Sequence, residues 1–229
     1  MSGYILIADG ACSKNPGPGG YGTIVITPHL QVAEFGGGEE NTTNNRMELM
    51  GFYRGLEEVL RIFSREQLGP KTLRAVLDSS YVIHGAEKYI WNWSKNGWKT
   101  QAGEVKNQDL WELILGALGR AKAVGFDIQY EQVKGHSGHE GNERADQISV
   151  AFARKQNIDL YFGPLSNYSV RLDARPYQPL YLSYVEGKLQ KHQTWMECEL
   201  RVKGKAGARF KKVTNRLQEE EVLKGWGLI

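Results

Sequence analysis

The chain has 229 residues, of which 41% are hydrophobic and 24% are charged, and its formal net charge is +3. This length and apolar content favour a globular protein over a disordered chain, with room for one substantial domain and a second, small one. No apolar run approaches the roughly 18 residues of a membrane span, and the first residues lack the basic region and apolar core of a signal peptide, so we expect neither.

Cysteine usage and charge distribution narrow the class further. Cys12 and Cys198 stand far apart and alone, so neither a disulfide framework nor a four-cysteine zinc site is available, which predicts a protein of the reducing cytoplasm. Residues 1–155 hold 17 Lys and Arg against 18 Asp and Glu, whereas residues 180–229 hold 10 against 6. The basic C-terminal end suggests a polyanionic partner, although a solvated basic surface is an equally common cause.

The first 155 residues alternate strand and helix patterns. Residues 4–9, 21–27 and 30–38 predict three successive antiparallel strands, with a turn rich in glycine and proline after the first. A long helix is expected over 42–63, where apolar residues recur at helical spacing behind polar N-cap candidates. A strand at 72–78, helices at 79–90 and 107–124, a strand at 126–133 and a helix from about 142 to 155 complete an α/β domain.

The rest of the chain predicts a linker and a small domain. Residues 156–179 lose periodicity and collect three prolines, which indicates a linker. Residues 180–229 predict a small α+β domain. A strand at 180–185 is followed by a turn at 186–188 and a second strand, then by a helix around 194–202, a third strand at 208–213 and a helix around 219–227.

Four acidic residues stand at the ends of predicted elements. Asp9 and Asp78 end the first and fourth strands, Glu48 lies in the first turn of the long helix, and Asp146 lies near the start of the last one. Ligands collect beyond the carboxyl ends of strands in sheets that contain parallel strands. If the four carboxylates converge, they form an oxygen-rich site for a hard divalent cation, but each alone could be a solvated turn or cap residue.

Five motifs occur in a specific order: DGACSKNPGPGGYG, TTNNRMELM, LDSSYV, WNWSKNGWKT and VKGHSGHEGNERAD. Together they resemble type 1 ribonuclease H, the endonuclease that cuts the RNA strand of RNA–DNA hybrids. The resemblance spans residues 1–155. It implies a ribonuclease H-like α/β domain with a mixed five-stranded sheet flanked by helices.

The resemblance also implies the catalytic groups. Asp9, Glu48, Asp78 and Asp146 match the family's metal-binding acids, which hold two Mg²⁺ ions, with Mn²⁺ as a substitute, and leave 5′-phosphate and 3′-hydroxyl ends. His136 matches its mobile catalytic histidine, and an imidazole that titrates near neutrality suits a proton carrier. His139 has no such role, which argues against a zinc site built from the two histidines.

Nucleic-acid contacts are implied in two places of this domain. The asparagines Asn15, Asn44 and Asn45 match residues that touch the hybrid in the minor groove, where 2′-hydroxyls distinguish RNA from DNA, although the TTNN run could also simply cap the helix. The family's basic protrusion, which grips the DNA strand, is matched by Trp91, Trp93, Lys95, Trp98 and Lys99. A tryptophan cluster taken alone more often packs in a core.

The C-terminal motifs TWMECELRV and ARFKKV resemble the hybrid-binding, viroplasmin-like domain over about residues 181–226. The resemblance implies that Trp195 and Phe210 stack on the DNA strand and that Lys211 and Lys212 contact phosphates. The alternative places both aromatic rings in a small core. A tethered module would hold the hybrid near the active site, and its preference for hybrid over double-stranded RNA stays open.

We therefore expect a monomeric cytoplasmic hydrolase with three segments: a catalytic domain (1–155), a linker (156–179) and a hybrid-binding domain (180–229). Its partner is the RNA–DNA hybrid, with no membrane. The alternative is a non-cleaving binder of hybrid or double-stranded RNA with a vestigial site, and a third possibility is a DNA-cleaving enzyme of the same fold. The intact acids disfavour a binder, and the close TTNNRMELM and GHSGHEGNERAD matches disfavour a DNA substrate.

Overall fold

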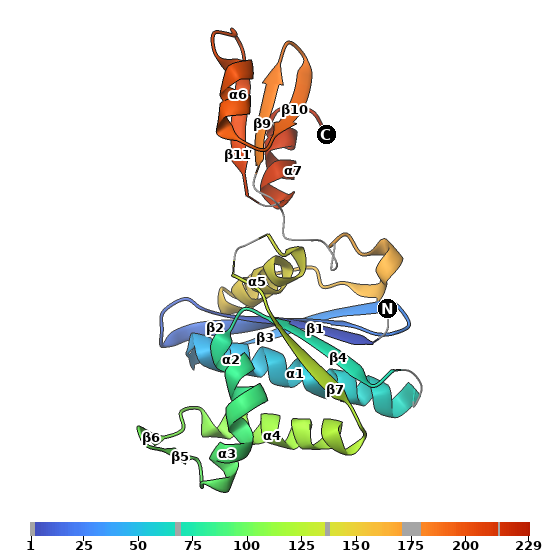
Figure 1. The fold of residues 1–229 in the computed structure, drawn as a ribbon, viewed down its shortest axis with the longest axis vertical. Coiled ribbons are helices and arrows are strands. Elements are labelled where there is room, and N and C mark those ends of the chain that lie inside the picture. The colour runs from blue at the N-terminus through green and yellow to red at the C-terminus, as the bar shows by residue number, and fades with distance from the viewer. Residues whose placement is uncertain (1–2, 67–69, 136–137, 171–179, 215) are drawn as a thin grey trace. The chain divides into compact units, whose positions relative to one another are not determined.

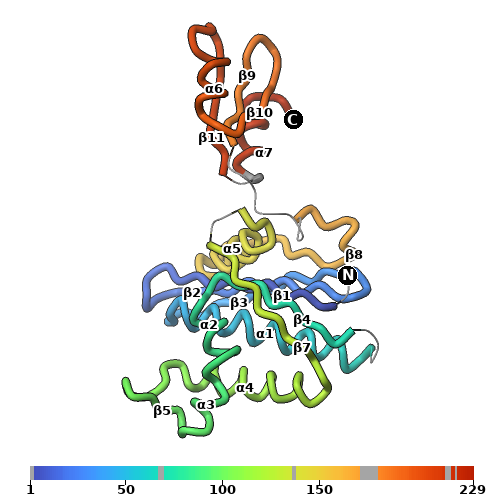
Figure 2. Tube along the Cα trace, in the orientation of Figure 1, coloured from blue at the N-terminus to red at the C-terminus, as the bar shows by residue number. Residues whose placement is uncertain are grey.

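Figure 1 shows the computed structural model, which describes residues 3–66, 70–135, 138–170, 180–214 and 216–229. The chain divides into two compact units, one formed by residues 1–135 and 141–170, the other by residues 136–140 and 171–229. Figure 2 follows the Cα trace from the blue N-terminus to the red C-terminus. Within the described residues, no helix combines the length and the apolar composition that crossing a membrane requires.

The larger unit is built on a mixed sheet of six strands in the order β7-β4-β1-β2-β3-β8. Strands β1, β2 and β3 form an antiparallel meander, and β4 and β7 run parallel to β1. The strand bounds are β1 (Tyr4–Cys12), β2 (Gly17–Ile26), β3 (Gln31–Thr42), β4 (Thr72–Leu77), β7 (Asp127–Gln132) and β8 (Phe162–Pro164).

Helices cover both faces of this sheet (Figure 1). They are α1 (Asn44–Glu66), α2 (Ser80–His84), a π-helical turn (Gly85–Tyr89), α3 (Ile90–Lys95), α4 (Gln108–Ala123) and α5 (Glu140–Ala153), with a two-stranded ribbon of β5 (Lys99–Thr100) and β6 (Gly103–Glu104). On α1, Leu49, Phe52 and Leu56 are fully buried in the core that the helix forms with the sheet. Each such side chain contributes about 2 kcal/mol by leaving water.

The mixed sheet flanked by helices confirms the expected fold class, with six strands where five were expected. The additional strand, β8, lies within the expected linker of residues 156–179 and pairs antiparallel with β3. Backbone bonds on both sides of it fix this pairing, from Glu34 N–H to Tyr161 O (2.8 Å) and from Leu165 N–H to Leu30 O (2.7 Å). The strand has three residues and ends in Pro164, which an edge strand tolerates, so its sequence carries no strand signal.

The smaller unit is an α+β fold, as expected. An antiparallel sheet in the order β10-β9-β11 is formed by β9 (Leu180–Val185), β10 (Lys188–His192) and β11 (Arg209–Val213). Leu180, Leu182 and Val213 pack with residues of α7 (Arg216–Gly225), while Val185 packs with Cys198 of α6 (Trp195–Val202). Because alternate residues of β9 serve the two clusters, α6 and α7 cover opposite faces of this sheet.

Candidate active site

Three carboxylates meet at one edge of the larger sheet. The parallel strands β1 and β4 pair in a register that places Ile7 opposite Val76. Two residues further on, the first segment reaches Asp9 and the second reaches Asp78. The first turns of α1 add Glu48. One ligand atom from each of these residues lies within 4.8 Å of the others. Three of the four acids therefore converge, two from neighbouring strands and one from α1. The expectation that Asp9 ends its strand is wrong, because β1 continues to Cys12 in its pairing with β2.

Neighbouring polar groups hold the carboxylates in place. The Gly10 N–H donates to Asp9 Oδ1 at 2.7 Å. Glu48 accepts from Asn44 Nδ2 at 2.8 Å on one oxygen and from the Ser79 hydroxyl on the other. These bonds fix the direction in which the carboxylates point, as outer partners of metal ligands do.

Burial and mutual repulsion act strongly on this cluster. Asp9 is 7% exposed, and burial, together with the negative charge of Asp78, raises its pKa to about 8. Burial followed by the charge of Asp78 also raises the pKa of Glu48, although hydrogen bonds from Ser79 and Asn44 oppose the shift. Buried and partly buried carboxylates that repel one another are the donor set that a hard divalent cation neutralises, so these residues fit a divalent metal.

Asp146 lies on α5, which covers the face of the sheet opposite α1. Its negative charge is among the causes of the raised pKa of Asp9, so the two carboxylates lie close enough to interact. It does not belong to the tight cluster of Asp9, Glu48 and Asp78. His136 lies outside the described residues, and the neighbouring His139 is 8% exposed, so it does not face solvent.

The three asparagines of the expected minor-groove contact lie beside this cluster. Asn15 Oδ1 accepts from the backbone N–H of Asn44 at 3.3 Å, which joins the turn after β1 to the start of α1. Asn15 and Asn45 are exposed. The expected cap is present as well, because Thr43 Oγ1 accepts from the Arg46 N–H at 3.4 Å.

The tryptophans of the expected protrusion separate into two kinds. Trp98 is 8% exposed and lies in the core, and Trp93 packs edge-on against Trp111 with ring centroids 5.4 Å apart. Core packing therefore accounts for these two rings, and Trp98 offers almost no surface to a nucleic acid. Trp91 is 37% exposed, and Lys95 and Lys99 are exposed.

In the smaller unit the expected binding residues are on the surface. Trp195 and Phe210 are 39% and 50% exposed, and their ring centroids lie 5.3 Å apart. Tyr181 continues the row, 5.6 Å from Trp195, and Lys212 Nζ lies 5.7 Å from the Tyr181 ring. The alternative in which these rings form the domain core does not agree with this exposure.

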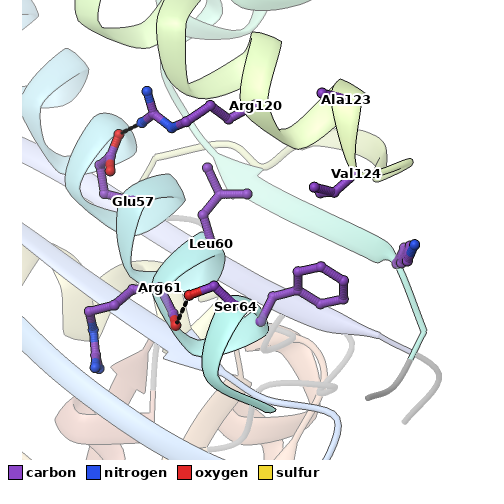
Figure 3. A pocket seen from close by; sticks show the side chains of 9 residues that line it. Glu57, Leu60, Arg61, Ser64, Arg120, Ala123 and Val124 are labelled. Atoms are coloured by element: carbon purple, nitrogen blue, oxygen red, sulfur yellow. Dashed lines mark hydrogen bonds and ion pairs between the residues drawn. The ribbon is translucent and has the colours of Figure 1, made fainter. Parts of the chain in front are cut away.

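Figure 3 shows a surface hollow elsewhere, between α1 and α4. It is lined by Glu57, Leu60, Arg61, Phe63, Ser64, Lys71, Arg120, Ala123 and Val124. Glu57 is nine residues after Glu48 on the same helix, so the hollow begins about 13 Å along the axis from the carboxylate cluster. It is not part of the active site.

Sequence reasoning missed the groups that position the acids. Ser79 directly follows Asp78, and Asn142, whose Nδ2 lies 3.5 Å from Asp78 Oδ2, stands in the motif of Asp146, so adjacency to an acid was the available signal. A second group, formed around Glu34 and Arg144, had no such signal, because these residues are 110 positions apart.

A mixed sheet with a cluster of three carboxylates, one buried and two partly buried, fits the class of enzymes that hold a divalent metal at the ends of parallel strands. Residues 1–154 match the RNase H family model. A ribonuclease H of Pseudomonas savastanoi pv. phaseolicola is 47% identical over 145 residues, which cover 63% of this chain and 88% of the relative. One of Rhodospirillum rubrum is 46% identical over 158 residues, covering 67% and 87%.

Solved structures agree with the fold. The crystal structure of LC9-RNase H1, a type 1 RNase H with the type 2 active-site motif, aligns with a TM-score of 0.57 and 26% identity over 74% of this chain and 81% of its own. The solution structure of the PFV RNase H domain aligns with a TM-score of 0.54 at 24% identity, over 67% and 96%. The chain belongs to the RNase H family, and it is a ribonuclease H.

Proposed function

We propose that this ribonuclease H cuts the RNA strand of RNA–DNA hybrids with Mg²⁺ held by Asp9, Glu48, Asp78 and Asp146. The observation that carries the proposal is the convergence of three of these carboxylates within 4.8 Å. When bound, two Mg²⁺ ions would lower the pKa of the attacking water and stabilise the leaving 3′ oxygen, which leaves 5′-phosphate and 3′-hydroxyl ends. Mn²⁺, which also prefers oxygen ligands, would be a substitute.

The chain's own groups orient the acids and move a proton. Ser79 and Asn44 hold both oxygens of Glu48, and the Gly10 N–H holds Asp9, so the carboxylates are preset before substrate binds. We assign to His136 the role of proton carrier for the leaving group or for product release. If His136→Ala kept full turnover across the pH range, this role would be wrong.

Substrate recognition follows from the groups around the acids. Asn15, Asn44 and Asn45 carry amides that both donate and accept, which suits contacts to 2′-hydroxyls of the RNA strand. Trp91, Lys95 and Lys99 offer exposed surface and charge to the DNA strand. Trp93 and Trp98 would support this segment from within the core.

The smaller unit, residues 180–229, would act as a module that binds the same hybrid. Its exposed Trp195 and Phe210 can stack on sugars or bases, and Lys211 and Lys212, which follow Phe210 on β11, can contact phosphates. The module could instead prefer double-stranded RNA, and a binding competition between hybrid and double-stranded RNA decides between the two. We also expect a monomer, and a cytoplasmic location in which the free cysteines Cys12 and Cys198 stay reduced.

The experiment is a gel assay with Mg²⁺ on end-labelled RNA–DNA hybrid, double-stranded RNA and double-stranded DNA. The native chain is compared with Asp9→Asn, and Asp127→Asn, which alters an exposed aspartate on β7, is the control. We expect cleavage of the RNA strand of the hybrid alone, lost in Asp9→Asn and kept in the control. Hybrid binding without cleavage in either Mg²⁺ or Mn²⁺ would instead support the non-cleaving binder.

A further inference from the structure

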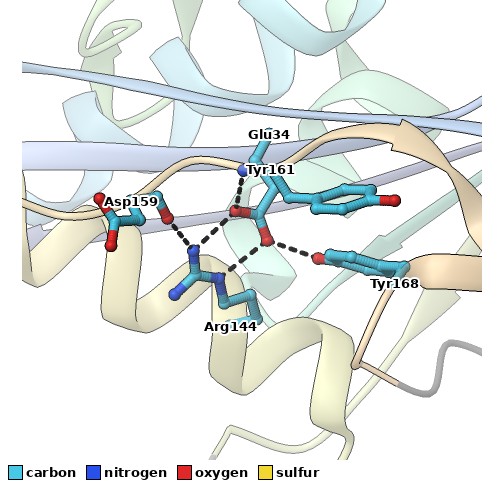
Figure 4. Close-up of polar contacts among 5 residues, drawn as sticks. All are labelled: Glu34, Arg144, Asp159, Tyr161 and Tyr168. Atoms are coloured by element: carbon cyan, nitrogen blue, oxygen red, sulfur yellow. Dashed lines mark hydrogen bonds and ion pairs between the residues drawn. The ribbon is translucent and has the colours of Figure 1, made fainter.

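A buried ion pair joins α5 to β3 on the face of the sheet that carries Asp9. Arg144 donates from Nε to Glu34 Oε1 at 2.8 Å and from Nη2 to Glu34 Oε2 at 2.7 Å. The side chain of Glu34 is fully buried and that of Arg144 is 20% exposed (Figure 4). A bidentate pair of this kind fixes the guanidinium in the plane of the carboxylate, and through it the helix that carries the arginine.

The segment after α5 completes this pair. Glu34 also accepts from the Tyr161 N–H at 2.9 Å and from the Tyr168 hydroxyl at 2.5 Å, and Arg144 Nη2 donates to Asp159 O at 2.5 Å. Burial alone would raise the pKa of Glu34, but the bonds from Arg144, Tyr168 and Tyr161 outweigh it and lower the pKa. Residues 159–168 lie beyond the part of the chain that matches the family model, so this support comes from outside the matched region.

A glycine beside Asp9 sets the other contact of α5. Gly22 is the direct partner of Asp9 in the β1–β2 pair. A Cβ on Gly22 would lie 2.1 Å from the backbone oxygen of Ala145, the residue before Asp146. The backbone of α5 therefore rests directly on the strand next to Asp9, and a side chain at this position would push the helix away.

We propose that the Glu34–Arg144 pair, completed by Tyr161 and Tyr168, positions Asp146 against Asp9 and so sets how tightly the acidic site holds its metal. Arg144 and Asp146 are two residues apart on α5, so a shift of the helix at one moves the other. The close contact between Gly22 and Ala145 prevents α5 from moving nearer to the sheet, and the Glu34–Arg144 ion pair prevents α5 from moving away from it. The inference rests on the proposed function, because it concerns the metal site of that reaction.

The test is calorimetric titration of the full chain with Mg²⁺ in the absence of nucleic acid, together with hybrid cleavage across Mg²⁺ concentration. Arg144→Lys keeps the charge but loses the bidentate geometry, and Tyr168→Phe removes one hydroxyl while leaving the ion pair. We expect each to weaken Mg²⁺ binding by up to about tenfold, the low end of the effect of removing a direct partner of a metal ligand, because the pair acts on Asp146 only through α5. Cleavage at saturating Mg²⁺ should stay close to that of the native chain.

Arg120→Lys is the matched control, because Arg120 forms an ion pair with Glu57 between α4 and α1, at the hollow of Figure 3. It should leave the Mg²⁺ dissociation constant unchanged. If Arg144→Lys and Tyr168→Phe lower the melting temperature but keep the native Mg²⁺ affinity, the pair only stabilises the fold and the inference is wrong. A native chain that binds no Mg²⁺ and cuts no hybrid would overturn the proposed function, and the inference with it.

Discussion

At the scale of single residues, the ionised carboxylate of Asp9 is unfavourable in the folded chain, and a bound cation would stabilise it. Its pKa is raised from an ordinary value of 3.8 to about 8 in the folded chain. Between these values the folded state binds a proton that the unfolded state releases, so the stability of the metal-free chain falls as pH rises from about 4 to about 8. Site formation therefore opposes folding unless a proton or a cation is present.

Replacing Asp9 by asparagine should remove this pH dependence. In the presence of a chelator, we expect Asp9→Asn to be more stable than the native chain at pH 8, by on the order of a few kcal/mol, and nearly equal to it at pH 4. Urea unfolding at several pH values measures the difference, and added Mg²⁺ should stabilise the native chain selectively. Equal slopes of stability against pH in the two chains would contradict the raised pKa.

Ser79 should affect the acid limb of the pH–rate profile of hybrid cleavage. Its hydroxyl bonds Glu48 and opposes the upward shift of the Glu48 pKa that burial causes. In Ser79→Ala that pKa rises further, so the acid limb of the pH–rate profile should move to higher pH and the maximal rate should fall about tenfold. The adjacent Ser80→Ala, at an exposed position, is the control, and a profile displaced equally in both variants would argue against a specific role for Ser79.

A site residue could be predicted from the sequence only where its neighbours along the chain form a recognisable motif. Asp9, Glu48 and Asp78 stand in local motifs, so the resemblance could name them, and the structure brings them within 4.8 Å of one another. Strand-end reasoning was less accurate, because Asp9 lies inside β1, which continues to Cys12. Glu34 gave no local signal, because its partner Arg144 and the hydroxyl of Tyr168 come from distant segments that only the tertiary fold brings to β3. Burial also distinguished Trp98 from Trp91, which no spacing in the motif could do.

At the scale of elements, the alternation of β11 separates its two lysines. Phe210 and Lys212 pair with Ser183 and Tyr181, on the face that carries α6 and Trp195, whereas Lys211 pairs with Leu182 on the face of α7. We therefore expect Lys212→Ala to weaken hybrid binding by about 1 kcal/mol and to reduce its salt dependence, with a smaller effect for Lys211→Ala. Fluorescence anisotropy at several salt concentrations compares them, and a larger effect for Lys211 would place the binding face on the other side of the sheet.

The segment 156–170 shows why an element can escape prediction. Its strand, β8, has three residues and a proline, and its stability comes from pairing with β3 and from the bonds to Glu34. Ending the chain after Lys155 removes all of these contacts, whereas ending it after Val170 keeps them. We expect the shorter chain to lose about 3 kcal/mol of unfolding free energy relative to the longer one, measured by urea denaturation. Equal stability of the two would mean that this segment contributes no support to the sheet.

At the scale of the whole molecule, the charge difference between the two parts of the sequence becomes a prediction about substrate capture. Residues 180–229 carry ten basic against six acidic residues, while residues 1–155 are nearly neutral. A tethered basic module raises the local concentration of hybrid at the catalytic unit without altering the chemical step. A chain ending after Val170 should therefore keep the native kcat but show a KM for hybrid at least about tenfold higher, with a shallower dependence on salt. Trp195→Ala in the full chain is the matched test of the same module, and it should raise KM in the same direction. Native KM and salt dependence in both variants would show that the catalytic unit captures the hybrid alone.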